Sequence, residues 1–334
     1  MIVVCGETLI DLAPVGGNTE GARTVPVGDA DSVASGGELW RALPGGSPAN
    51  VAVALARLKT QTAMLARIST DPFGRILRDR LVREGVDLRY VVQADEPSTL
   101  AVVSFDDVGN ASYSFYLEGT ADWQWRTTEL PEAFGPEVSA IHAGSMALMR
   151  PPGGPVLEAM LSRESKYRVI SLDPNVRPVL CPDPLGYRQA VERWLRFAHL
   201  VRASVDDVRW LYPEAEPREV VERWLELGPL VVVLTLGADG ACGATRSGVR
   251  CEVGGLPVRV VDTIGAGDTF SGALLHRLEK ENALSASRLA GLGADELEAA
   301  MRFAVAAAAV NCQRAGADPP REDEVAALLG VPGS

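Results

Sequence analysis

Residues 260–279 read VVDTIGAGDTFSGALLHRLE, which combines a tight turn with the start of a helix. We predict that a strand ends at Asp262, that three small residues at 265–267 form the turn, and that a helix begins at about Asp268. Free backbone N–H groups at a helix start, together with the helix dipole, attract an anion such as a phosphate. Small residues let the anion approach the backbone itself. This stretch therefore predicts an anion site.

Asp268 lies at the edge of that predicted site. A carboxylate beside bound phosphate is electrostatically unfavourable unless it performs a task, and a base that takes a proton from a hydroxyl would explain it. The alternative is a helix N-cap, which stabilises a helix by about 0.5–2 kcal/mol. For an aspartate taken alone the cap is favoured. The preceding GAG and the second aspartate, Asp262, favour the base.

The rest of the chain alternates short apolar runs with longer amphipathic stretches, which is typical of βα units around a mainly parallel sheet. Strands are predicted at residues 2–5, 62–66, 140–142, 169–172, 200–203 and 231–235. Helical spacing of apolar residues occurs at 49–58, 74–84 and 187–197. The sequence therefore predicts a doubly wound α/β fold.

Two stretches interrupt this alternation. Residues 15–43 are rich in Gly, Asp and Ser, and residues 98–125 alternate as strands. We predict that they form a small β-sheet lid over a core of residues 1–14, 44–97 and 126–330. A solvent-facing decoration or a dimer contact is an equally favoured reading of the same sheet.

Composition excludes several classes of protein. The chain has 334 residues, 32 basic and 44 acidic, so its net charge of -12 disfavours a general nucleic-acid binder. It has three lysines (Lys59, Lys166 and Lys280), none of which follows a glycine, so a GxxxxGK[ST] phosphate loop is absent. No GxGxxG follows a predicted strand, which argues against a nicotinamide-dependent oxidoreductase.

The compartment is predicted from the amino terminus and the cysteines. The chain begins MIVVCGETLIDL without a basic leader, and its longest apolar run, at about 304–310, is far shorter than the roughly 20 residues of a membrane span. Its five cysteines are scattered and lack CxxC spacing, as expected of reduced thiols. We expect a cytoplasmic protein without membrane or nucleic-acid partners.

Two motifs resemble one known family. DTIGAGD at 262–268 resembles the carboxy-terminal signature of the ribokinase-like (PfkB) carbohydrate kinases, and GGSPANVAVALARL at 45–58 resembles their amino-terminal signature. Further similarity covers essentially the whole chain, including GETLIDL at 6–12, SLDPNVRP at 171–178 and TLGADGA at 235–241. The resemblance implies an α/β core with a β-sheet lid, ATP as phosphoryl donor and a primary alcohol of a sugar as acceptor.

The resemblance also assigns roles to individual residues. Asp268 matches the catalytic base, and the anion hole matches Gly265, Ala266 and Gly267. The substrate side matches Asp11, Gly45, Gly46, Asn50, Asn175 and Arg177, of which Arg177 is a candidate phosphate clamp. The nucleotide side matches Thr235, Gly237 and Gly240. Without the family, Asp11 reads as a turn residue at a strand end, and Arg177 reads equally well as a surface arginine.

Metal sites are implied by the same resemblance. A Mg–ATP complex is expected, with Asp207 linked to Mg²⁺ through water; the alternative is that Asp207 caps the following helix. A monovalent cation such as K⁺ is expected near the anion hole. Its oxygens would come from Asp262 and from the carbonyls of Ile264, Asn311, Arg314 and Gly316.

The sequence most resembles the fructokinase branch, through GE near the start, PAN, HAGS at 142–145 and DPNVRP. Ser47 stands where ribokinases carry lysine, which disfavours ribose. We therefore expect phosphorylation of a ketohexose, D-fructose to fructose 6-phosphate. A 2-keto-3-deoxygluconate kinase is the nearest alternative, but it calls for a lid arginine where this chain has Leu117 after Phe115 and Tyr116.

Another PfkB sugar or nucleoside kinase is a further alternative. A non-catalytic sensor is disfavoured by the intact GAGD, and a homodimer through the lid is suggested by analogy.

Overall fold

An eight-stranded sheet forms the centre of the computed structural model, which describes residues 1–15, 39–105, 111–178, 181 and 183–330. Six neighbouring strands of the sheet pair in parallel, and the last two pairings at one edge are antiparallel. Its strands, in spatial order, are β14 (Arg250–Val253), β13 (Ala241–Thr245), β12 (Val231–Thr235), β11 (Leu200–Ser204), β10 (Val169–Asp173), β9 (Ala140–Gly144), β1 (Ile2–Cys5) and β4 (Thr62–Leu65).

The central strands are buried on both faces, which explains their continuous apolar sequence. In β1, Ile2 and Val4 belong to the apolar cluster on one face of the sheet, whereas Val3 and Cys5 belong to the cluster on the other. Successive side chains of a strand point to opposite faces, so one short apolar run contributes to two cores. The six predicted strands all lie in this sheet, and the predicted α/β class is confirmed.

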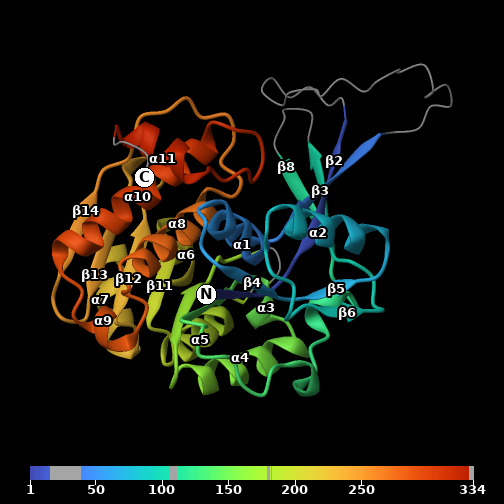
Figure 1. The fold of residues 1–334 in the computed structure, drawn as a ribbon, viewed down its shortest axis with the longest axis horizontal. Helices are drawn as coiled ribbons and strands as arrows, with labels where there is room; N and C mark the ends of the chain where they lie inside the picture. The colour runs from blue at the N-terminus through green and yellow to red at the C-terminus, as the bar shows by residue number, and fades with distance from the viewer. Residues whose placement is uncertain (16–38, 106–110, 179–180, 182, 331–334) are drawn as a thin grey trace.

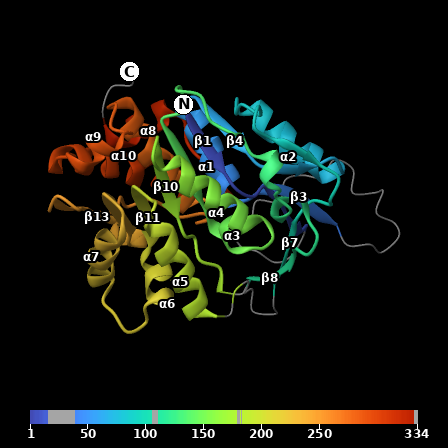
Figure 2. The same ribbon diagram turned by 90° about the horizontal axis from the view of Figure 1, so that it is seen from below.

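Helices cover both faces of the sheet (Figure 2). The helices of the first face are α1 (Ser47–Arg57), α2 (Pro72–Arg83), α8 (Ala266–Lys280), α9 (Ala286–Ala290), α10 (Ala294–Cys312) and α11 (Glu322–Leu329). Those of the second face are α3 (Ser145–Met149), α4 (Gly153–Glu164), α5 (Pro184–Leu195), α6 (Val205–Leu211) and α7 (Pro217–Leu227). In the described part of the chain, no helix is both long enough and apolar enough to cross a membrane.

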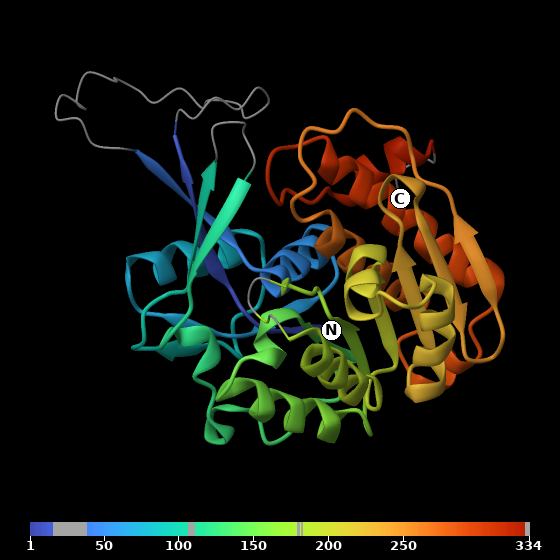
Figure 3. The same cartoon turned by 180° about the vertical axis from the view of Figure 1, so that it is seen from behind.

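A second, four-stranded sheet projects from one side of this body, beside α1 and α2 (Figures 1 and 3). Its strands in order are β3 (Trp40–Gly45), β2 (Leu9–Pro14), β7 (Leu100–Phe105) and β8 (Ala111–Tyr116). A pair of short strands, β5 (Arg67–Ser69) and β6 (Val92–Ala94), lies near its base.

The lid boundaries differ from the prediction at both ends of the first lid segment, since β3 of the small sheet continues to Gly45 instead of ending at 43. Residues 1–14 were assigned to the core, but β2 pairs in the small sheet, with Asp11 opposite Leu43 and Ala101. The chain leaves the main sheet at Cys5 and enters the small sheet at Leu9, so the crossing lies within GETL rather than at residue 15. Residues 16–38 and 106–110 of the predicted lid lie outside the described residues.

The predicted strand ending at Asp262 is wrong. The backbone N–H groups of Val261 and Asp262 both donate to the carbonyl of Cys312, at 2.8 and 3.2 Å, instead of joining a neighbouring strand. The segment is an irregular loop held by the end of α10. Helix α8 then begins at Ala266, slightly before the predicted Asp268.

Two buried carboxylates lie where the chain crosses between the sheets. Asp122 accepts bonds from the Thr8 N–H at 2.9 Å and the Thr99 hydroxyl at 2.6 Å, and Glu7 accepts one from the Ala147 N–H at 3.2 Å. Burial raises the pKa of both Glu7 and Asp122 to about 7. The carbonyl of Glu7 lies directly beneath Gly46, so this crossing supports the GGSPAN turn.

Glu7→Gln should change how stability depends on pH. The folded state keeps the Glu7 proton up to about pH 7, whereas an unfolded glutamate loses it near its ordinary value, so wild-type stability falls across that interval. The variant lacks this titration. Its free energy of unfolding relative to wild type should increase by up to about 3 kcal/mol from about pH 5 to about pH 8.

Urea unfolding at several pH values measures this difference. Glu132→Gln, at an exposed glutamate, is the matched control and should keep the wild-type slope. Equal slopes for Glu7→Gln and the control would contradict the prediction.

Candidate active site

Asp268 joins the two sequence signatures. Its Oδ1 accepts a hydrogen bond from the Ser47 hydroxyl at 2.7 Å, and its Oδ2 accepts one from the Asn50 side-chain amide at 2.9 Å. Ser47 and Asn50 lie in the first turn of α1 and Asp268 in the first turn of α8. The two helices approach closely at Gly272, where a Cβ would come within 2.8 Å of the Ala54 Cβ. Helix packing therefore orients the Asp268 carboxylate.

The start of α8 retains free backbone donors. Gly265 has φ 75°, a left-handed conformation that favours glycine, and Ala317 packs against it. The N–H of Ala266 donates to Thr263 and that of Thr269 donates to Gly265. In the described part of the chain, the N–H groups of Gly267 and Asp268 have no acceptor. The predicted turn thus leaves two donors for an anion.

Charges around Asp268 oppose one another. Burial raises its pKa, the hydrogen bonds from Ser47 and Asn50 lower it, and nearby Asp173 raises it again. The Arg177 guanidinium lowers it. A carboxylate with a raised pKa, two orienting donors and a neighbouring cation is suited to receive a proton.

Asp11 lies near one of the same charged groups as Asp268. A Cβ on Gly45 would collide with the Asp11 carboxylate, so this side chain needs glycine opposite it. Burial raises the pKa of Asp11 to about 6, and Arg80 and Arg177 oppose that rise. Arg177 therefore lies close enough to influence Asp11 and Asp268 together.

Arg80 was missed in the sequence, where α2 reads simply as an amphipathic helix. Its guanidinium donates to the carbonyl of Pro44 at 2.7 Å, to Oδ1 of Asn50 at 3.2 Å and to the carbonyl of Ala317 at 3.1 Å. With Oδ1 facing Arg80, the Asn50 amide nitrogen is directed at Asp268. Arg80 thus orients a donor to the carboxylate.

The DPNVRP segment follows β10 toward this site. Asn175 adopts φ 40°, its N–H donates to Asp173 at 3.1 Å, and its side-chain nitrogen is buried without a partner among the described residues. Arg177 donates to the carbonyls of Asn175 and Val176, in its own loop. Ligand contacts of Asn175 and Arg177 stay predictions.

The TLGADG loop follows β12. Gly237 and Gly240 have φ of 63° and 100°, so this turn requires glycine for its backbone path. Thr235 receives a hydrogen bond from Arg202 at 2.6 Å, a contact that no motif predicted. Nucleotide contacts of Thr235, Gly237 and Gly240 stay predictions.

Asp207 caps a helix, which was the alternative predicted from the sequence. Its carboxylate accepts hydrogen bonds from the N–H groups of Ser204 and Val176, at 2.9 and 2.8 Å. The Ser204 hydroxyl in turn accepts from the N–H of Asp207 at 3.0 Å, which completes a capping box. Burial and the nearby Asp173 raise its pKa. A water-mediated link to Mg²⁺ stays a prediction.

The residues of the predicted monovalent-cation site come together from the loop before α8, the last turn of α10 and the loop after α10. Asp262 accepts from the N–H groups of Ile264 and Gly316 at 2.9 and 2.7 Å, and the Asn311 side chain donates to the Ile264 carbonyl at 2.8 Å. Arg314 directs its side chain to Glu324. Carboxylate and carbonyl oxygens suit a hard cation, and a carbonyl that accepts one bond keeps a second lone pair.

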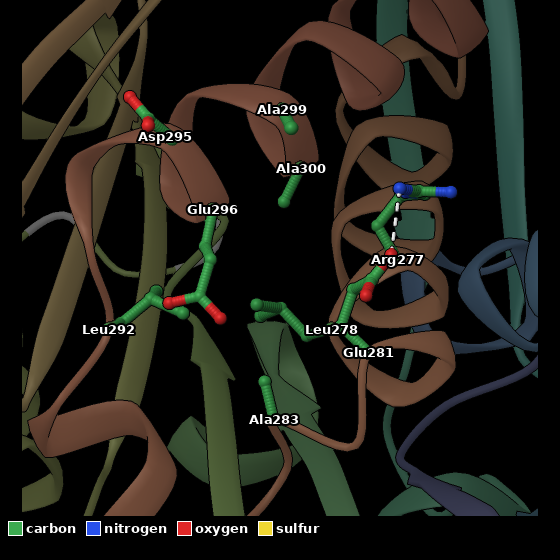
Figure 4. Close-up of a pocket in the computed structure, with 9 residues that line it drawn as sticks. All are labelled: Arg277, Leu278, Glu281, Ala283, Leu292, Asp295, Glu296, Ala299 and Ala300. Carbon is green, nitrogen blue, oxygen red and sulfur yellow. Dashed lines mark hydrogen bonds and ion pairs between the residues drawn. The ribbon is translucent and has the colours of Figure 1, made fainter.

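A pocket of about 260 Å³ lies at the other end of α8 (Figure 4). Among its lining residues, Arg277 pairs with Glu281 at 3.0 Å, and Glu296 accepts from Arg288 at 2.9 Å and from the N–H of Gly293 at 3.0 Å. These charges are satisfied within the protein. Since Asp268 is in the first turn of α8 and Arg277 in the last, the pocket is separate from the candidate site.

Known proteins resemble this chain over most of its length. The sequence profile of the pfkB family carbohydrate kinases matches residues 1–324. The chain belongs to this family. A fructokinase of Rhizobium leguminosarum bv. trifolii is 36% identical over 292 residues, covering 87% of this chain and 84% of that protein. Fructokinase-1 of Oryza sativa subsp. japonica is 32% identical and covers 98% of this chain and 97% of that protein.

Solved structures of fructokinases share the fold. One from Xylella fastidiosa with bound ATP superposes with a TM-score of 0.85 at 26% identity, covering 98% of both chains. A double mutant from Vibrio cholerae O395, with fructose, ADP and potassium ion bound, has a TM-score of 0.80 at 27% identity and covers 98% of this chain and 97% of that one. The predicted family is confirmed.

Ser47→Ala should raise the pKa of Asp268, because it removes a hydrogen bond that stabilises the charged carboxylate. If Asp268 acts as a base, the acid limb of the pH profile for sugar phosphorylation should move to higher pH. The plateau rate should fall by about tenfold or less, since Asn50 still orients the carboxylate. Steady-state kinetics across pH measure both, with Ser162→Ala on the exposed side of α4 as control. An unmoved acid limb would refute this role of Ser47.

Proposed function

We propose that this pfkB-family protein is an ATP-dependent kinase that phosphorylates a primary hydroxyl of a ketohexose, converting D-fructose to fructose 6-phosphate. The observation that carries the proposal is the pairing at the start of α8. Asp268 is held by Ser47 and Asn50, and it lies beside backbone N–H groups that have no acceptor in the described residues. A base and an anion site side by side are what phosphoryl transfer to an alcohol requires.

Each part of the candidate site has its own role in this reaction. Asp11 accepts hydrogen bonds from sugar hydroxyls, and Asn175 lies beside the same site. Asp268 takes the proton of the reacting sugar hydroxyl while the hydroxyl oxygen bonds to the γ-phosphorus of ATP. The bond between the γ-phosphorus and the bridging oxygen breaks, and that oxygen leaves with ADP. The N–H groups at Gly265 and Gly267, with Arg177, stabilise the negative charge on the phosphoryl oxygens, whereas that of Ala266, which the resemblance also assigned to the anion hole, donates to the Thr263 carbonyl at 3.2 Å. The proton leaves Asp268 when the product departs.

The nucleotide and the cations have candidate residues. Thr235, Gly237 and Gly240 would hold the nucleotide at the end of β12, where α/β folds bind ligands. Mg²⁺ would neutralise phosphate charge, with Asp207 linked to it through water. Asp262 and the carbonyls of Ile264, Asn311, Arg314 and Gly316 would hold a monovalent cation such as K⁺, which would fix the loop beneath the anion hole.

Two observations favour a neutral sugar over a sugar acid. Arg80, the half-buried arginine with the larger charge influence on Asp11, already uses three of its five N–H donors on protein acceptors, which leaves fewer for a substrate carboxylate. Leu117, where a lid arginine would serve a sugar acid, is buried and apolar. The fructokinases among the relatives support fructose. A cytoplasmic location and a dimer through the small sheet remain proposals.

Asp268→Asn should lower kcat by about 100- to 10,000-fold, because the amide cannot take the proton of the hydroxyl. ATP affinity should change by less than about threefold, since the backbone donors remain. Coupled ADP release measures turnover, and calorimetry measures binding. Asp206→Asn, at an exposed aspartate, is the matched control and should keep wild-type kinetics. Near wild-type turnover of Asp268→Asn would sink the mechanism.

A sugar panel tests the substrate. Fructose should have the highest kcat/KM among fructose, ribose, 2-keto-3-deoxygluconate, tagatose phosphate and nucleosides. A higher value for 2-keto-3-deoxygluconate would replace fructose by the sugar acid. If sugars bind but no sugar of the panel causes ADP release, a sensor would be favoured over an enzyme.

A further inference from the structure

Arg202 is a charged residue in the middle of the central sheet. It lies on β11 between the buried residues Val201 and Ala203, and it is 8% exposed. Burying a guanidinium costs free energy that its partners only partly restore, and a buried ion pair is weak evidence for stability. Its presence therefore needs a reason other than packing.

The guanidinium touches three elements of the candidate site. It donates to Asp173 of β10 at 2.9 Å and to the Thr235 hydroxyl at the end of β12 at 2.6 Å. Its face lies against the first turn of α8, where a Cβ on Gly267 would come within 2.7 Å of Nη1. Phe270 packs on it, with 5.8 Å from Cζ to the ring centroid. One planar group thus spans the DPN loop, the nucleotide-side loop and the anion turn.

Among the described residues, unpaired N–H donors at the start of α8 argue for an anionic ligand here. The start of a helix carries partial positive charge, so a cation beside it is unfavourable unless an anion compensates. Asp173, Asp207 and Asp268 supply negative charge around the guanidinium, and Asp173 also accepts a hydrogen bond from Ser271 at 3.1 Å. Arg202 Nε is buried and has no acceptor in the described residues, and the N–H of Gly267 beside it has none. In the part of the chain that the structure describes, the arrangement therefore has N–H donors without acceptors at the anion turn, beside a buried cation.

We propose that Arg202 is a positioning residue for phosphoryl transfer, holding the Gly267 turn against Thr235 and keeping that turn positive for the phosphate of the nucleotide. The role rests on the proposed kinase function. Asp173 orients the guanidinium, and neither residue need touch the sugar. An arginine suits this position because its planar fork reaches two acceptors while its face covers the turn.

Three variants test the role. Arg202→Met removes the charge and keeps much of the volume, Arg202→Lys keeps the charge without the fork, and Arg168→Met is the matched control. Arg168 is also a buried arginine, paired with Glu164 at 2.8 Å, but it precedes β10 at the far end of the strand from the DPN loop. Its loss should lower thermal stability without lowering kcat.

Arg202→Met should lower kcat by about 100-fold or more with the KM for sugar within about threefold, and Arg202→Lys should recover to within about tenfold of wild type. Three results would overturn the role. They are an equal fall of kcat in the Arg202→Met and Arg202→Lys variants, a similar fall of kcat in Arg168→Met, and near wild-type kcat in Arg202→Met. If Arg202→Met melts below the assay temperature, Arg202→Gln, which keeps a donor for Asp173, takes its place with the same expectations.

A binding measurement separates this inference from the kinase proposal. Calorimetry should show ADP affinity reduced by about tenfold or more in Arg202→Met, with adenosine affinity unchanged, because only ADP carries phosphate. An unchanged ratio of ADP to adenosine affinity would overturn the inference even where the wild-type protein phosphorylates sugar. Absence of wild-type turnover on every sugar would instead sink the kinase proposal, while the ADP result would still test Arg202.

Discussion

The Asp268 carboxylate depends on donors that come from a helix more than two hundred residues earlier in the chain. Its burial raises its pKa, and the bonds from Ser47 and Asn50 oppose that rise and set the direction of both oxygens. Those bonds exist only because α1 and α8 pack closely, at a point where Gly272 carries no side chain. Since a small displacement of a reacting group costs much of its rate, the proposed role of Asp268 as a base depends on this helix contact.

Arginines replace lysine in organising the site's charge. Arg80 links the GGSPAN turn to the loop at Ala317, Arg177 lies within charge influence of Asp11 and Asp268, and Arg202 links three strands to the start of α8. A guanidinium has five donors in a rigid plane, so one residue can hold several elements together. Although the chain has few lysines, the anion turn therefore has arginines nearby and backbone N–H groups that can face an anion.

The sequence predicted the features that depend on local pattern. Apolar runs such as IVVC became strands buried on both faces, and Gly265 and the two glycines of TLGADG stand at positive φ where the turns need them. Prediction failed where pairing partners decide. Val260 to Asp262 looks like a strand but bonds to the end of α10, and β2 belongs to the small sheet because its partners are β3 and β7.

The sequence by itself determined the α/β class, the family, and which residue types stand in the two signatures, because spacing and turn chemistry are properties of the chain alone. Only the tertiary structure decided that Ser47 donates to Asp268, that Arg80 orients Asn50, and that Arg202 lies against Gly267. Each of these is a contact between residues far apart in the chain. Side-chain direction and charge coupling at such contacts depend on how helices and strands pack, which local pattern does not specify.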